Sequence, residues 1–124
     1  MHDPSPRPAP RLSIVIDNYN YEQFVARAID SALEQTVADL TEVIVGDDGS
    51  TDRSMAVIAP YAARARVIDQ PNGGQASAYN AGFAAARGQL VLFLDADDWL
   101  YPDAAAEIIA AWTPGTSKVQ FLLD

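Results

Sequence analysis

The chain has 124 residues, 49% of them hydrophobic, which is enough for a single domain with a sizeable core. Its net charge of −9 argues against a nucleic-acid or anionic-membrane surface, and the absence of cysteine excludes a disulfide framework and a thiol nucleophile. The one histidine, His2, lies in the N-terminal tail, which excludes a histidine-based triad within this sequence. Because the sequence has no apolar segment of membrane-spanning length and no signal-peptide core, we expect a cytoplasmic protein.

The first third of the chain predicts a strand followed by a helix. Residues 1–11 are rich in proline, and we expect them to form a disordered lead-in. Leu12 to Ile16 is an apolar run that predicts a buried strand. From Tyr21 to Gln35 the apolar residues recur at helical spacing. The turn between the two elements holds four polar or aromatic residues: Asp17, Asn18, Tyr19 and Asn20.

The next segment repeats this order of strand, polar loop and helix. Val43 to Val45 predicts a strand, and we expect a helix over Asp52 to Ala63 that Pro60 kinks or shortens. The loop between them combines carboxylates with residues that favour a tight turn and a helix start: Asp47, Asp48, Gly49, Ser50 and Thr51.

A third strand and helix follow directly. Val67 and Ile68 predict the strand, and Gly73 and Gly74 allow either a turn or a close backbone approach beside a ligand. An alanine-rich helix is expected over Gln75 to Arg87, with Gly88 as its C-cap.

The stretch from Leu90 to Trp99, LVLFLDADDW, joins a buried strand to three carboxylates. Residues two apart on an extended chain point to the same side, so Asp95 and Asp97 should project together. Two such carboxylates repel each other unless they share a cation or a proton. This favours a divalent-metal site over a plain helix cap, for which Asp98 alone would be enough.

The remaining elements complete an alternating α/β pattern. A helix is expected over Pro102 to Trp112 and a last strand over Val119 to Leu123. We therefore predict an α/β fold, a mostly parallel sheet of about five strands with flanking helices. The last strand has an apolar face that includes Phe121, so a homodimer formed through this region is expected.

Three of the predicted strands end in polar clusters, and these clusters should face one crevice because ligands bind beyond the carboxyl ends of parallel strands. Loops are rich in Asp, Asn and Gly in any case, but carboxylates gathered at one edge are unfavourable without a cation. A calcium loop starting at Asp95 is excluded, because Trp99 and Leu100 occupy its fifth and sixth positions. Neither a dinucleotide glycine motif nor a Walker lysine motif is present.

Five segments in order resemble the nucleotide-sugar-binding half of glycosyltransferase family 2, inverting enzymes of the GT-A fold. They are LSIVIDNYNY, AIDSALEQT, EVIVGDDGSTD, NGGQASAYNAGFAAARG and FLDADD, and they cover nearly everything from Leu12 onward. The resemblance implies a Rossmann-like nucleotide-binding half. It makes residues 12–124 a nucleotide-sugar-binding domain, truncated before the acceptor-binding half.

The resemblance also implies roles for single residues, beginning with the base pocket. Asp17, Asn18 and Tyr19 would line that pocket, Asp48 would hydrogen-bond the imide of a uracil or related base, and Asn80 would lie near the donor.

The Asp-x-Asp motif of the family corresponds to Asp95, Ala96 and Asp97. By resemblance Asp97 would bind Mn²⁺ or Mg²⁺ directly, and Asp95 would support the ribose or a metal-bound water. Hard oxygen ligands suit both ions, and a divalent cation neutralises the charge that develops on a nucleoside diphosphate as it leaves.

Two residues depart from the family pattern: Asp17 stands where many relatives have Pro, and Tyr79 where many have Arg. No catalytic base is nominated, because the family's base lies in the acceptor half, expected beyond Asp124, and Glu107 fits a solvated helix position. The predicted reaction transfers a sugar, with inversion, from a nucleoside-diphosphate donor, expected to be UDP-linked. The acceptor is a hydroxyl on a polysaccharide, a lipid-linked sugar or a protein. A non-catalytic nucleotide- or metal-binding module and a structural domain with vestigial loops remain open alternatives.

Overall fold

The structure is a computed structural model that describes residues 9–112 and the backbone of 119–122. It contains a five-stranded sheet in the order β3-β2-β1-β4-β5, with every neighbouring pair parallel. This confirms the predicted α/β fold and its parallel sheet. The strands are β1 (Leu12–Asn18), β2 (Thr41–Asp48), β3 (Arg66–Gln70), β4 (Leu90–Asp95) and β5 (Val119–Leu122).

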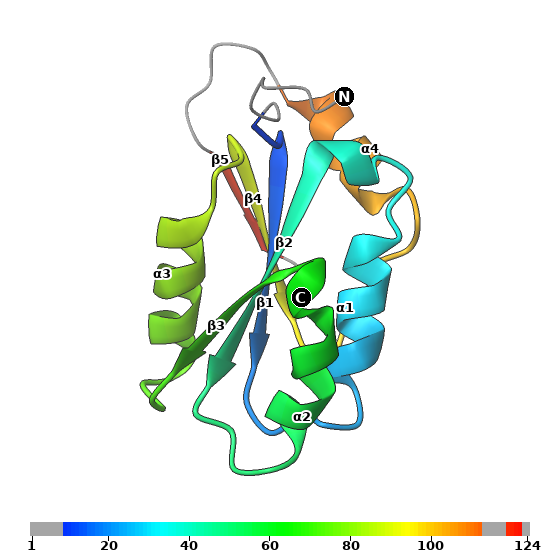
Figure 1. The fold of residues 1–124 in the computed structure, drawn as a ribbon. Coiled ribbons are helices and arrows are strands. Elements are labelled where there is room, and N and C mark those ends of the chain that lie inside the picture. Colours follow the sequence, from blue (N-terminus) through cyan, green and yellow to red (C-terminus); the bar gives the residue numbers. More distant parts are fainter. Residues whose placement is uncertain (1–8, 113–118, 123–124) are drawn as a thin grey trace, which may run out of the picture.

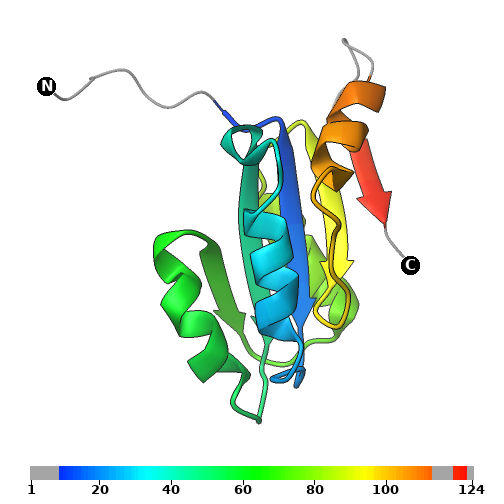
Figure 2. The ribbon, with the colours of Figure 1, turned by 90° about the vertical axis from the view of Figure 1, so that its right-hand side faces the viewer.

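Helices cover both faces of the sheet, as Figure 1 shows. On one face lies α3, and on the other lie α1, α2 and α4, the face that Figure 2 presents to the viewer. The α-helices are α1 (Val25–Leu33), α2 (Ser54–Ile58), α3 (Gln75–Ala85) and α4 (Ala104–Ala111), with 3₁₀ turns at η1 (Ala38–Leu40) and η2 (Ala59–Ala63). Each helix in the described part of the chain is too short or too polar to cross a bilayer.

The central strands β1, β2 and β4 are buried on both faces, which explains their unbroken apolar runs, whereas β3 is partly exposed. Under α3 lies a small core in which the ring of Phe93 packs against Tyr79 at 4.6 Å and Phe83 at 6.3 Å between centroids. The opposite face carries a larger core shared with α1, α2 and α4. Its strand residues include Ile14, Ile16, Val43, Val45, Leu92 and Leu94, which alternate with the residues of the smaller core.

Several predicted element ends differ from the observed ones. The helix expected over Asp52–Ala63 is divided into α2 and η2, with Pro60 in the first turn of η2, as its missing N–H requires. Gly88 is not the C-cap of α3, because that helix ends at Ala85. A Cβ at Gly88 would lie 2.8 Å from the Ser13 backbone nitrogen, so the glycine permits a close approach to β1.

Two further expectations concern the chain ends and the acidic loop. Asp98 is not a helix cap, because α4 begins only at Ala104. The proline-rich residues 1–8 and the side chains of the last strand, including Phe121, lie outside the described residues. The lead-in and the expected homodimer contact therefore stay predictions.

Candidate functional site

A pocket of about 420 Å³ lies beyond the carboxyl ends of β1, β2 and β4. In the sheet order, β2 and β3 follow β1 on one side, whereas β4 and β5 lie on the other. The pocket thus sits where the strand order reverses, the usual ligand site of an open α/β sheet. The lining residues are Asp17, Tyr19, Tyr21, Asp48, Asn72, Gly74, Gln75, Asp95 and Asp97. The predicted convergence of the three polar clusters is confirmed.

Strand alternation decides which carboxylates enter this pocket. Asp17 is the register partner of Asp95, and both continue the face covered by α3, as Asp48 does on β2. Asn18 and Asp47 are register partners on the opposite face. Adjacent polar residues therefore fall into two sets. Asp17, Asp48 and Asp95 face the pocket, and the second set, Asn18 and Asp47, lies on the opposite face of the sheet.

The second set braces two loops against each other. The Asp47 carboxylate accepts hydrogen bonds from Asn18 Nδ2 at 2.8 Å, from Ser50 Oγ at 2.7 Å and from the Ser50 backbone nitrogen at 3.0 Å. Asn20, in the left-handed region at φ 59°, accepts from the Thr51 backbone nitrogen at 2.8 Å. Asn18 thus binds Asp47 on the face of the sheet opposite the pocket residues, and the base-lining role expected for it stays a prediction.

Asp17 is the most perturbed acid of the pocket. Its side chain is only 8% exposed, and among the described residues Oδ1 has no hydrogen-bond partner. The pKa of Asp17 is raised to about 7, mainly by burial and then by the charges of Asp48, Asp95 and Asp47, while hydrogen bonding by Gln75 acts in the opposite direction. A carboxyl buried among carboxylates favours either protonation or a nearby cation.

Asp48 holds the segment that follows β3. Its Oδ1 accepts a hydrogen bond from the Gly73 backbone nitrogen at 2.8 Å, and its Oδ2 accepts from that of Gly74 at 3.0 Å. Gly74 adopts φ 91°, a conformation that suits glycine. The contact brings Asn72, Gly74 and Gln75 into the pocket. Sequence reasoning did not name these three as site residues, although the glycine pair was a signal for close backbone approach.

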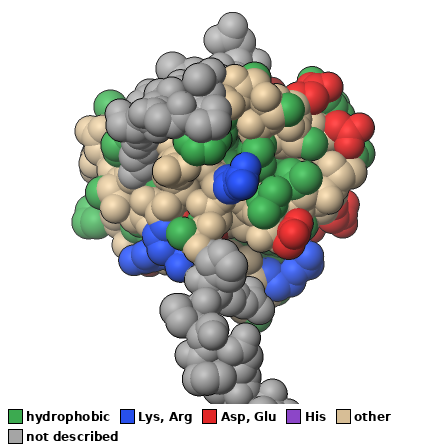
Figure 3. Space-filling view, turned by 90° about the horizontal axis from the view of Figure 1, so that it is seen from above, with side chains coloured by type: hydrophobic (Ala, Val, Ile, Leu, Met, Phe, Trp, Pro, Cys, Tyr) green, Lys and Arg blue, Asp and Glu red, His purple; other side chains and the backbone are tan. Residues whose placement is uncertain are grey.

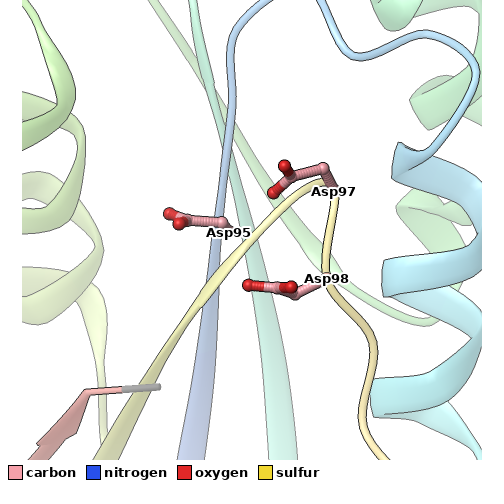
Figure 4. A group of neighbouring side chains, drawn as sticks. All are labelled: Asp95, Asp97 and Asp98. Atoms are coloured by element: carbon pink, nitrogen blue, oxygen red, sulfur yellow. The ribbon is translucent and has the colours of Figure 1, made fainter. Parts of the chain in front are cut away.

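Three carboxylates gather at the end of β4 and in the turn after it (Figure 4). One oxygen from each of Asp95, Asp97 and Asp98 lies within 4.8 Å of the others, so the predicted grouping of Asp95 with Asp97 is confirmed and Asp98 joins it. Burial raises the pKa of the Asp98 carboxyl, the charges of Asp97 and Asp95 add to this, and Arg27 opposes it. Such a set of hard oxygen donors fits Mg²⁺ or Mn²⁺.

One oxygen of Asp95 is already engaged by α3. Oδ1 accepts hydrogen bonds from Tyr79 Oη at 2.5 Å and Gln75 Nε2 at 2.7 Å. Burial and the bond to Asp95 raise the pKa of the Tyr79 hydroxyl, which therefore stays protonated and donates. Tyr79 is a site residue by contact, whereas Asn80, the neighbour expected near the donor, is exposed on α3 and outside the pocket lining. Ala96 is fully buried, and its backbone nitrogen donates to the Asp17 carbonyl at 3.1 Å.

Arg27 lies beside Asp98, but in the described part of the chain no cationic side chain is among the lining residues of the pocket. Arg64, Arg66 and Arg87 instead line a cavity of about 430 Å³ near the edge at which the strands begin, beside Glu42. Figure 3 looks onto that end of the molecule and shows basic side chains there, all of them Arg among the described residues. The carboxylate pocket therefore has only neutral donors as partners within its lining.

Comparison with known proteins gives one consistent result. The family model described as "Glycosyl transferase family 2" matches residues 13–120. An uncharacterized glycosyltransferase of Nostoc sp. is 47% identical over 103 residues, which cover 80% of this chain and 32% of that protein. The chain spans about a third of the length of the curated relatives it matches first.

Solved structures share this fold. S. aureus TarS in complex with UDP-GlcNAc superposes with a TM-score of 0.72 at 27% identity, covering 81% of this chain and 30% of that one. A mannosyltransferase from Pyrobaculum calidifontis in complex with GDP-Man and Mn²⁺ gives 0.75 at 27% identity, covering 90% of this chain and 35% of that one.

Proposed function

Because the chain belongs to glycosyl transferase family 2, we propose that its carboxylate pocket binds the nucleoside-diphosphate part of a sugar donor together with Mn²⁺ or Mg²⁺. The full reaction is transfer of the sugar, with inversion, to an acceptor hydroxyl. The observation that carries the proposal is the gathering of Asp17, Asp48, Asp95 and Asp97 in one pocket whose described lining includes no Lys or Arg. A bound divalent ion offsets their repulsion and joins them to an anionic diphosphate.

The cation site consists of Asp97 and Asp98, with Asp95 contributing its second oxygen. Oδ1 of Asp95 is held by Tyr79 and Gln75, so Oδ2 is left to face the ion, a bound water or the ribose. When bound, the ion neutralises the charge that develops on the departing nucleoside diphosphate. The chain's own part is to keep the three carboxylates together before the ligand arrives.

The base is assigned to the part of the pocket formed by Tyr19, Tyr21 and Asp48. The two tyrosines are 42% and 40% exposed, so both offer ring surface on which a base can stack, although the Tyr21 ring also contacts Phe24 edge-on. Asp48 has spare acceptor capacity beyond the bonds from Gly73 and Gly74. In this assignment the donor nucleotide is UDP, and Asp48 accepts the imide N–H of uracil through a remaining lone pair. The GDP-Man complex of a structural neighbour makes GDP the necessary competitor in the test.

Calorimetry of UDP binding with Mn²⁺ and with chelator tests this proposal. We expect Mn²⁺ to tighten UDP binding by about tenfold or more, or about 1.4 kcal/mol. Asp97→Asn should remove this metal-dependent gain, and Asp48→Asn should weaken uridine binding even in chelator. Asp39→Asn, which neutralises an exposed carboxylate at the far end of β2, is the matched control. Equal UDP affinity with and without Mn²⁺ would contradict the metal site, and tighter binding of GDP than of UDP would contradict the base assignment.

A further inference from the structure

Helix α1 presents a polar stripe to the segment that carries the carboxylates. Arg27 and Ser31 are four residues apart on α1 and lie on one side of it, and Gln35 follows just beyond the end of the helix at Leu33. All three contact the segment 98–105, which runs from Asp98 of the acidic group to the first turn of α4. The opposite side of α1 is anchored in the large core through Val25, Ala28, Ile29 and Ala32.

Ser31 and Gln35 hold backbone groups of this segment by hydrogen bonds. Ser31 Oγ accepts a hydrogen bond from the Leu100 backbone nitrogen at 3.0 Å and donates to the Ala28 carbonyl at 2.8 Å. The buried Gln35 side chain donates to the Tyr101 carbonyl at 3.0 Å and accepts from the Ala105 backbone nitrogen at 2.8 Å. Ser31 and Gln35 thus bind backbone groups of Leu100, Tyr101 and Ala105, in addition to the bond from the Ala104 nitrogen to the Tyr101 carbonyl.

Arg27 contacts the residue that directly follows the acidic group. Its guanidinium lies 3.8 Å from the centroid of the Trp99 ring, within the range of a cation–π contact. Arg27 therefore holds Trp99, the neighbour of Asp98, against α1.

We propose that Arg27, Ser31 and Gln35 are positioning residues that keep Asp97 and Asp98 in cation-binding geometry. The proposal rests on the metal site assigned under the proposed function. A short loop between β4 and α4 with few backbone bonds of its own has little intrinsic order. Its attachment to a helix anchored in the core restricts the carboxylates to one arrangement, which lowers the entropic cost of binding a cation. This role also accounts for the segment AIDSALEQT, which contains Ser31 and Gln35 but does not line the pocket.

Ser31→Ala tests this proposal, with two readouts on the metal-free and Mn²⁺-loaded chain. Hydrogen exchange of the Leu100 amide reports the bond to Ser31 directly, and electron paramagnetic resonance of free Mn²⁺ reports cation affinity. We expect faster exchange at Leu100 and Mn²⁺ binding weakened about 3- to 10-fold, at the low end of effects on supports of metal ligands. Ser31→Thr, which keeps the hydroxyl, should restore both values.

Tyr61→Phe is the matched control, because it removes another hydrogen bond of α1, the 2.7 Å bond from Tyr61 Oη to Asp30, without changing charge. It should lower stability but leave Mn²⁺ affinity unchanged. If Ser31→Ala speeds Leu100 exchange but leaves Mn²⁺ affinity unaltered, the proposal is overturned. It is also overturned if Tyr61→Phe weakens Mn²⁺ binding as much as Ser31→Ala does. Absence of Mn²⁺ binding by the wild-type chain is a different result, since it refutes the proposed metal site itself.

Discussion

Replacement of Asp17 by Asn should make the metal-free protein less sensitive to alkaline pH. The Asp17 side chain is 8% exposed and has a pKa raised from 3.8 to about 7. In the unfolded chain the carboxyl titrates near its ordinary value, so between these two pKa values the folded state binds more protons than the unfolded state. The protonated form therefore contributes stability at low pH, and this contribution is lost as the pH rises through the pKa of the folded state.

The magnitude follows from the size of the shift. Each pKa unit corresponds to about 1.4 kcal/mol, and the shift extends over about three units. Part of the loss has already occurred by pH 5, so linkage predicts that wild-type stability falls by about 3 kcal/mol between pH 5 and pH 8 on account of this residue. Above pH 8 the contribution is constant, because Asp17 is then ionised in both states.

Urea unfolding at a series of pH values with chelator present measures this effect. The difference in unfolding free energy between Asp17→Asn and wild type should grow by about 3 kcal/mol from pH 5 to pH 8, in favour of the variant. Asp39→Asn removes the same charge from an exposed site and corrects for general repulsion in a chain of net charge −9. If Asp17→Asn and wild type show parallel pH profiles, Asp17 titrates normally and the electrostatic description of the pocket is wrong.

Other substitutions test the packing around the site. Gly82→Ala would place a Cβ 2.3 Å from Val15 Cγ1, so we expect a loss of about 1–3 kcal/mol in unfolding free energy, partly recovered when Val15 is also changed to Ala. Asp47→Ala removes the carboxylate to which Asn18 and Ser50 donate, leaving Asn18 only its 3.2 Å bond to Ser50 Oγ, and should cost about 2–3 kcal/mol, with faster amide exchange at Ser50. Unchanged exchange there would show that the loop is held by other contacts. In both cases the midpoint of urea unfolding is the measurement.

Much of the architecture is readable from local patterns. Apolar runs of strand length, helical spacing between them and turn residues at the junctions are properties of short segments, and they predicted the alternating α/β order. The placement of Asp17, Asp48, Asp95 and Asp97 around one pocket was also predictable, because the carboxyl ends of parallel strands meet at one edge of the sheet.

The partition of adjacent polar residues depended on tertiary structure. Asp17 and Asn18 extend β1 because they pair with β2 or β4, and pairing places one on each face of the sheet. From the sequence alone both belonged to a single polar turn. The same holds for Asp47 and Asp48, of which only Asp48 lines the pocket.

The rotation of α3 about its axis is the clearest example of what only the tertiary structure decided. Tyr79 donates to Asp95, whereas its neighbour Asn80 is exposed, and the place expected for Asn80 near the donor stays a prediction. Helix packing sets this choice, since Gly82 lies against Val15 and turns Tyr79 toward β4. Neighbouring residues on a helix point in directions about 100° apart. The sequence by itself determined the chemical types at this edge of the sheet, and contacts between distant segments determined which of them share the pocket.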